Sequence, residues 1–118
     1  DLCARPSIGL ATEALGRPSV VPTSTGRVLA CSHRGSVGYR NGGADAYKLA
    51  FLREVDDRWT PIVEDLRPDG DSEWCSRMRC YSAVLPTGDQ TLMLYNGDGF
   101  GASGVIAAPI DLGQLVRT

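Results

Sequence analysis

The chain has 118 residues, of which 42% are hydrophobic and 22% charged, values typical of one folded domain and not of a disordered polypeptide. Its formal net charge is −2, so it lacks the basic excess that neutralises a phosphate backbone, and we expect no nucleic acid partner. No apolar run approaches the roughly 18 residues that span a bilayer, and no signal-peptide pattern stands at the start. We therefore expect a soluble protein without a membrane partner and favour the cytoplasm.

Short apolar segments broken by Gly, Pro and Asp predict β-strands along most of the chain. We expect seven strands, at residues 19–22, 27–32, 47–55, 61–64, 81–85, 90–95 and 104–109. The sequences TSTG and PTGD are short enough for hairpin turns, and VDDRW predicts another tight turn. The polar segment 67–73 predicts a loop between two groups of strands, whereas residues 1–15 fit a strand, a helical turn or a loop.

A repeat organises these strands. The stretch RPSVVPTSTGRVLACSHRG (17–35) aligns with YSAVLPTGDQTLMLYNGDG (81–99) after one gap, at a period of about 63 residues. In this alignment the sequence VVP at 20–22 corresponds to VLP at 84–86, and VLAC at 28–31 corresponds to TLML at 91–94. A Gly-rich loop and a further strand follow each copy.

A repeated antiparallel meander is typical of a β-propeller blade, which stacks on its neighbours because it cannot bury both faces alone. We predict an all-β fold of two antiparallel meander units, a partial β-propeller. The chain is expected to be a single domain with blade-like repeats at 16–66 and 74–112. A two-sheet sandwich with coincidentally similar hairpins is the alternative.

Two long motifs resemble the five-bladed β-propeller glycoside hydrolases of the arabinanase and xylosidase type. The segment CSHRGSVGYRNGGADAYKLAFLREVDDRW (31–59) resembles one blade of that family. The next blade of the family contains W-D-S-E-M-x-C-Y-P and M-F-Y-N-G-N-G-[FY]-G-x-[ST]-G. Here Trp74, Met78 and Cys80-Tyr81 match the first of these motifs, and residues 93–104 match the second. The likeness covers about residues 16–110 and only the two C-terminal blades of the family.

The resemblance implies a role with carbohydrate, but the acidic residues of the family are replaced. Its Asp and Glu in W-D-S-E-M fall on Cys75 and Arg77. Glycoside hydrolysis generally needs two carboxylic groups across the scissile bond, so we assign no catalytic residue and expect no hydrolysis by this chain alone. Five blades also need about 250 residues. Either further blades lie upstream, or the chain forms a homo-oligomer, for which three two-bladed copies would close a six-bladed ring.

Residues at strand ends and in Gly-rich loops are the candidates for binding sugar. Guanidinium groups suit vicinal hydroxyls or a carboxylate, and imidazole or amide groups suit single hydroxyls. The six candidates are Arg17, His33, Arg34, Arg40, Asn96 and Asp98. Each has a structural alternative: a surface ion pair for the arginines, a backbone hydrogen bond for His33, and turn formation for Asp98. Tyr39, Phe100 and Trp74 are candidate stacking faces or core residues.

Neither a metal nor another cofactor is expected. Cys75 and Cys80 have no zinc-knuckle spacing, and the sequences around Cys31 and Cys80 favour reduced core thiols over a disulfide. The stretch YNGDGFGASG (95–104) has no following Lys-Ser/Thr, so a nucleotide loop is not supported. Two other functions stay open: a small structural or interaction protein on a blade scaffold, and an enzyme that uses Cys75 as its nucleophile.

Overall fold

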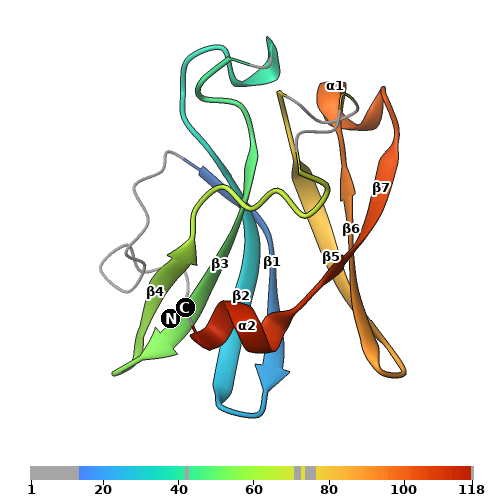
Figure 1. The fold of residues 1–118 in the computed structure, drawn as a ribbon. Helices are drawn as coiled ribbons and strands as arrows, with labels where there is room; N and C mark the ends of the chain where they lie inside the picture. Colours follow the sequence, from blue (N-terminus) through green and yellow to red (C-terminus); the bar gives the residue numbers. More distant parts are fainter. Residues whose placement is uncertain (1–13, 42, 71–72, 74–76, 118) are drawn as a thin grey trace.

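The structure, a computed structural model, describes residues 14–41, 43–70, 73 and 77–117. These residues form two antiparallel sheets of four and three strands that pack face to face (Figure 1). The predicted all-β fold of two meander units is confirmed, and the seven strands do not close into a ring. The predictions made for Trp74 and Cys75 lie outside the described residues.

The first sheet is a meander of four neighbouring strands. Its order is β1 (Ala14–Thr23), β2 (Gly26–Arg34), β3 (Lys48–Val55) and β4 (Arg58–Val63). A 3₁₀ turn at Tyr39–Asn41 interrupts the long loop between β2 and β3. Because β1 starts at Ala14, the ambiguous segment 1–15 ends inside a strand.

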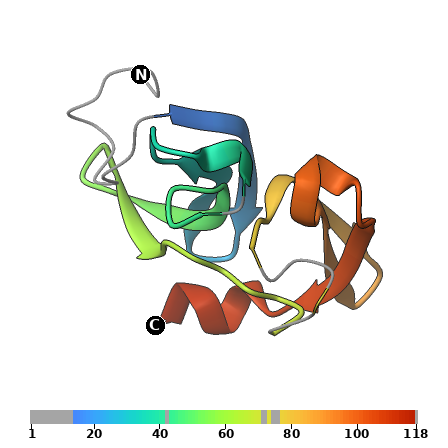
Figure 2. The same cartoon turned by 90° about the horizontal axis from the view of Figure 1, so that it is seen from above.

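The second sheet repeats the meander with three strands. Its order is β5 (Cys80–Thr87), β6 (Gln90–Asn96) and β7 (Val105–Ile110). A short kinked helix, α1 (Asp98–Gly101), connects β6 to β7, and α2 (Leu112–Arg117) follows β7. Figure 2 shows α2 running from the end of β7 to a position beside the first sheet. Neither helix of the described part is long and apolar enough to cross a membrane.

The hairpins β1–β2 and β5–β6 have the same register, with counterparts 64 positions apart. Gly16 pairs with Ser32 as Cys80 pairs with Asn96, and every later pair of the two hairpins follows the same shift. Each first strand bulges directly after that pair. The predicted gap is therefore wrong, because both turns contain two residues. The segment 28–31 corresponds to 92–95, one position beyond the predicted 91–94.

The core between the sheets comes from alternate residues of both. Val28 and Ala30 of β2 and Phe51 of β3 pack against Met93 and Tyr95 of β6. A second buried cluster lies on the opposite face of the first sheet and consists of Leu29, Cys31, Ala50, Leu52 and Trp59. The central strands of the first sheet are thus buried on both faces, while the second sheet is covered on one face only.

Candidate functional site

Four segments from both sheets meet at one end of the molecule: the start of β1, the loop after β2, the start of β5, and α1 (Figure 1). They meet because β1 and β2 are antiparallel, so Ala14 lies opposite Arg34, while Cys80 lies opposite Asn96 in the second sheet. Antiparallel pairing therefore brings the start of each first strand beside the end of the second strand, and the packing of the two sheets brings both repeats to the same end.

Four aromatic rings form the centre of this end. The ring centroid of Tyr47 lies 6.1 Å from that of Tyr39, 5.4 Å from Tyr81 and 5.8 Å from Phe100. Tyr81 and Phe100 are stacked, with centroids 6.2 Å apart and planes inclined by 29°. Since two rings belong to each repeat, the rings connect the two sheets.

Three arginines lie against these rings. The Cζ atom of Arg34 stands 3.7 Å from the ring centroid of Tyr39 and 6.0 Å from that of Tyr47. Arg40 Cζ is 5.2 Å from the Tyr39 centroid, and Arg40 Nε donates a hydrogen bond to the Tyr39 hydroxyl at 3.2 Å. Arg17 Cζ lies 5.5 Å from the Tyr81 centroid. We call these three arginines and four aromatic residues the arginine–aromatic cluster.

Bulged backbone positions both Arg17 and Tyr81. Both residues have left-handed φ angles, 50° and 58°, and directly follow the equivalent pairs Gly16–Ser32 and Cys80–Asn96. The N–H of Tyr81 donates at 2.7 Å to Ser32 Oγ of the first sheet, which is fully buried. The bulge in β5 is therefore tied to the neighbouring sheet, and it directs the Tyr81 ring to the arginines.

The cluster combines accessible guanidinium groups with half-buried rings. Arg17 and Arg40 are exposed, whereas Arg34 and the four aromatic side chains are intermediate in burial. A hydrogen bond with Tyr47, followed by burial, raises the pKa of Tyr81 above its ordinary value. The Tyr81 hydroxyl therefore keeps its proton to a higher pH than an isolated tyrosine does.

His33 lies away from the cluster. Its Nε2 donates to the backbone carbonyl of Glu64 at 2.6 Å, and only 9% of the residue is exposed. It pairs with Lys48 of β3 and shares the face of Leu29 and Cys31, which points away from the second sheet. This position matches the structural alternative for His33, a strand-end side chain bonded to the backbone.

The side chain of Asp98 holds the start of the second repeat. Its Oδ1 accepts the backbone N–H groups of Arg77 at 2.9 Å and Met78 at 2.8 Å. The nearby Asn96 packs against Gly101, whose φ is 95°, and a Cβ there would lie 3.2 Å from Asn96 Cγ. Asp98 thus joins the loop after β6 to residues 77 and 78, which lead into β5 beside the cluster.

Two carboxylates at this end, among the residues that the structure describes, accept hydrogen bonds from the main chain. Asp45, in the loop before β3, accepts the N–H of Val37 at 2.8 Å, and Asp98 accepts two backbone donors. Both carboxylates are therefore occupied by main-chain hydrogen bonds. The part of the chain that the structure describes also contains no group of three His, Cys, Asp or Glu side chains that could hold a metal ion.

The structure brings Arg17, Arg34 and Arg40 together as members of one cluster, whereas Asn96 and Asp98 border it. Tyr47 and Tyr81 were not among the predicted site residues. Their signal lay in the motifs A-Y-K-L-A and C-Y, since both rings belong to the segments that carry the family resemblance.

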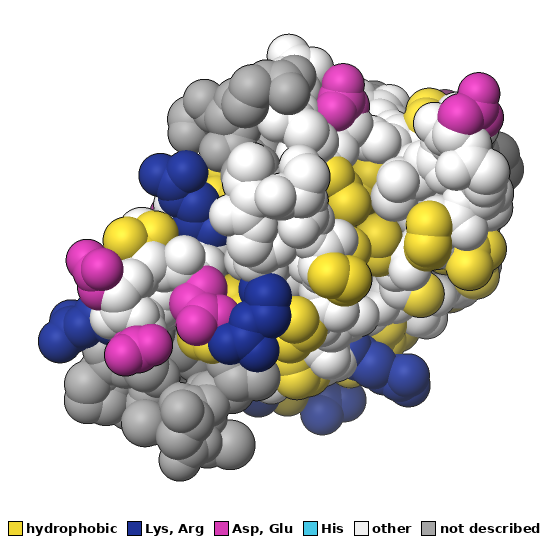
Figure 3. Space-filling view, turned by 90° about the horizontal axis from the view of Figure 1, so that it is seen from below, with side chains coloured by type: hydrophobic (Ala, Val, Ile, Leu, Met, Phe, Trp, Pro, Cys, Tyr) yellow, Lys and Arg dark blue, Asp and Glu magenta, His cyan; other side chains and the backbone are white. Residues whose placement is uncertain are grey.

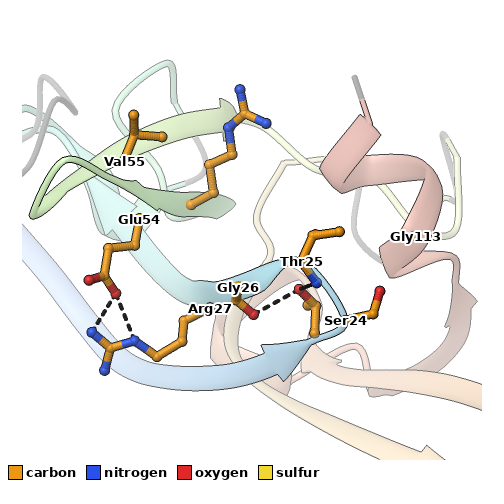
Figure 4. A pocket seen from close by; sticks show the side chains of 9 residues that line it. Ser24, Thr25, Gly26, Arg27, Glu54, Val55 and Gly113 are labelled. Carbon is orange, nitrogen blue, oxygen red and sulfur yellow. Dashed lines mark hydrogen bonds and ion pairs between the residues drawn. The ribbon is translucent and has the colours of Figure 1, made fainter.

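A separate hollow of about 400 Å³ lies at the opposite end of the first sheet (Figure 4). The turn between β1 and β2, the end of β3 and Gly113 line it. The Arg27 guanidinium in this hollow forms an ion pair with Glu54 and lies 5.8 Å from the Trp59 ring centroid. The Arg27 and Glu54 side chains in this hollow are thus paired with each other.

Comparisons of the chain with protein-family models, curated proteins and solved structures gave no match. The fold and the cluster therefore define the molecule as an all-β protein of two stacked antiparallel meanders with an arginine-rich aromatic end.

Proposed function

We propose that the arginine–aromatic cluster binds carbohydrate on a blade-type scaffold, as a diverged and partial relative of the propeller glycoside hydrolases. The observation that carries the proposal is the convergence of three guanidinium groups and four aromatic rings from both repeats on one end of the sheets. Aromatic faces suit the apolar face of a pyranose ring, and guanidinium forks suit its hydroxyls or a carboxylate.

The sequence resemblance supports the same proposal independently. Arg34 and Tyr39-Arg40 stand in the first family-like motif, while Tyr81 and Phe100 stand in the second. Residues chosen from two separate motifs thus meet in space, as a shared binding role requires. Catalysis by this chain alone is not part of the proposal, because Asp45 and Asp98 are occupied by backbone donors.

A glycan array followed by calorimetric titration tests the proposal. We expect binding to wild-type protein and a loss of about tenfold or more in Arg34→Ala, since a charge-assisted hydrogen bond contributes roughly 1.5–3 kcal/mol. Arg53→Ala, which removes an exposed guanidinium at the opposite end, is the matched control and should bind normally. Absence of binding by wild-type protein at millimolar sugar would refute the proposal.

An activity assay tests the catalytic part. The chain should not turn over aryl-glycosides or oligosaccharides. Turnover that disappears in Asp98→Ala would overturn this part of the proposal while leaving sugar binding intact.

A second candidate function, a small structural or interaction protein on the same scaffold, is favoured by a different surface. The face of the second sheet that points away from the first exposes apolar side chains, including Leu85 and Val105, which are 48% and 66% exposed.

A further inference from the structure

The centre of the outer face of the second sheet is apolar, with Thr87, Gln90 and Asn96 at its ends. The three strands β5, β6 and β7 contain no charged residue. On the face that points away from the first sheet, cross-strand neighbours form two rows, Ala83–Leu94–Ala107 and Leu85–Leu92–Pro109. From below, hydrophobic side chains are visible at the surface on the side of the second sheet (Figure 3).

This composition is unusual for a sheet face in water. Antiparallel strands with one solvated face normally alternate apolar and polar residues. In the middle of β5, β6 and β7 both alternating sets are apolar, as in a sheet that is covered on both sides. The first sheet shows what such coverage looks like, since β2 and β3 are buried on both faces.

The repeat relates the outer face of the second sheet to a contact surface inside the molecule. Val84 and Met93 of the second sheet face the first sheet, and their counterparts 64 positions earlier, Val20 and Leu29, point away from the second sheet. The two sheets therefore stack in the same sense. The outer face of the second sheet is equivalent to the face of the first sheet that receives β5.

The strand that makes this contact also has an exposed counterpart. Within the chain, β5 provides the main contact of the second sheet with the first, chiefly against β2 and β1. Its equivalent in the first repeat is β1, whose outward residues Leu15 and Val20 are 39% and 43% exposed. The molecule thus exposes the outer face of the second sheet and, of the equivalent face of the first sheet, the β1 part, while the β2 and β3 part is buried. These two exposed surfaces carry four of the six exposed large hydrophobic residues among those described: Leu15, Val20, Leu85 and Val105.

We infer that a second copy of this chain docks head to tail, with its β1 on the outer face of the second sheet, so that β1 repeats between copies the contact that β5 makes within the chain. Val20 of the second copy would then pack near Leu85 and Leu92, as Val84 packs against the first sheet. This contact brings no like charges together, because β5, β6 and β7 contain no charged residue.

A polar contact follows from the same equivalence. Ser32 Oγ accepts the N–H of the bulged residue Tyr81 at 2.7 Å. The counterpart of Ser32 is Asn96, and the counterpart of Tyr81 is Arg17. Between copies, the Asn96 side-chain oxygen would therefore accept the N–H of the bulged Arg17 of the second copy.

Head-to-tail contacts repeat until a ring closes. Since propellers typically have four to eight blades and each copy supplies two units, closed rings contain about two to four copies. A two-fold pairing of outer faces is the competing arrangement, but it would leave Leu15 and Val20 exposed.

Sedimentation analysis of the 118-residue chain over a range of concentrations tests the inference. Wild-type protein should assemble, whereas Val20→Lys and Leu85→Lys should each be monomeric and folded. Each variant loses a different half of the contact, so mixing the two should give a complex of two chains that grows no further. Val37→Lys, at a loop residue 76% exposed, is the matched control and should assemble like wild type.

Two results would overturn the inference. One is a wild-type chain that stays monomeric at every concentration, which would assign the outer face to a different occupant. The other is a Val20→Lys variant that keeps the wild-type mass, because pairing through the outer faces does not need β1. Circular dichroism of each variant establishes that a monomeric result is not caused by unfolding.

Discussion

Replacing Arg79 by Leu should cost about 3–5 kcal/mol of unfolding free energy, because it leaves a carboxylate inside the protein without its guanidinium partner. Only 3% of the Arg79 side chain and 10% of the Asp69 side chain are exposed. Arg79 Nε donates to Asp69 Oδ1 at 3.0 Å and Nη2 donates to Oδ2 at 3.2 Å, while the Tyr95 hydroxyl also donates to Oδ1. A domain of this kind has a total stability of about 5–15 kcal/mol, so the loss is a large share.

Urea unfolding followed by circular dichroism measures this loss. With a slope of about 2 kcal/mol per molar, the midpoint should fall by roughly 1.5–2.5 M. Arg67→Leu is the matched control, because its ion pair with Asp65 is exposed and should contribute less than about 1 kcal/mol. The double variant Asp69→Leu/Arg79→Leu should recover much of the lost stability, since no unpaired charge remains. Equal midpoints for Arg79→Leu and the control would refute the reasoning.

Two further predictions concern a turn and the thiols. Asp56 and Asp57 adopt left-handed φ angles of 51° and 63° in the β3–β4 hairpin, so Asp57→Gly should raise stability by up to about 1 kcal/mol; a lower melting temperature would contradict this. Burial raises the pKa of Cys31 and of Cys80 from 9.0 to about 11. The contribution of these thiols to the free energy of unfolding is therefore fully present below pH 9 and is lost as the pH rises to 11. The loss is at most about 1.4 kcal/mol per pH unit for each thiol. Urea titrations across this range should give a flatter decline for Cys31→Ala/Cys80→Ala, and an equal decline would contradict the assignment.

The strands were predictable because their signal is local. Alternation and turn residues identified all seven strands, although β1 and β2 extend further than their apolar runs. The register of the repeat was missed by one residue, since the turn sequences STGR and GDQT differ although both turns contain two residues. α2 was not predicted because its six residues are too few to show a helical period.

The site was only partly predictable because its geometry depends on contacts between distant residues. The sequence pointed to Arg17, Arg34 and Arg40 at strand ends. It did not indicate that Tyr47 and Tyr81 would meet, since the packing of the two sheets creates that contact.

The face to which a side chain points depends on register, and this decided the position of His33. It directly precedes Arg34 in the sequence, yet the two side chains lie on opposite faces of β2. The hydrogen bonds of Asp98 to residues 77 and 78 likewise depend on how the loop closes and not on its composition.

The most direct test of carbohydrate binding at the arginine–aromatic cluster is an amide NMR titration with the sugar selected on the glycan array. We predict saturable shifts at Tyr39, Tyr47, Tyr81 and Phe100 that disappear in Arg34→Ala. Shifts confined to the hollow at Thr23–Arg27, or no saturable shifts at all, would contradict the account.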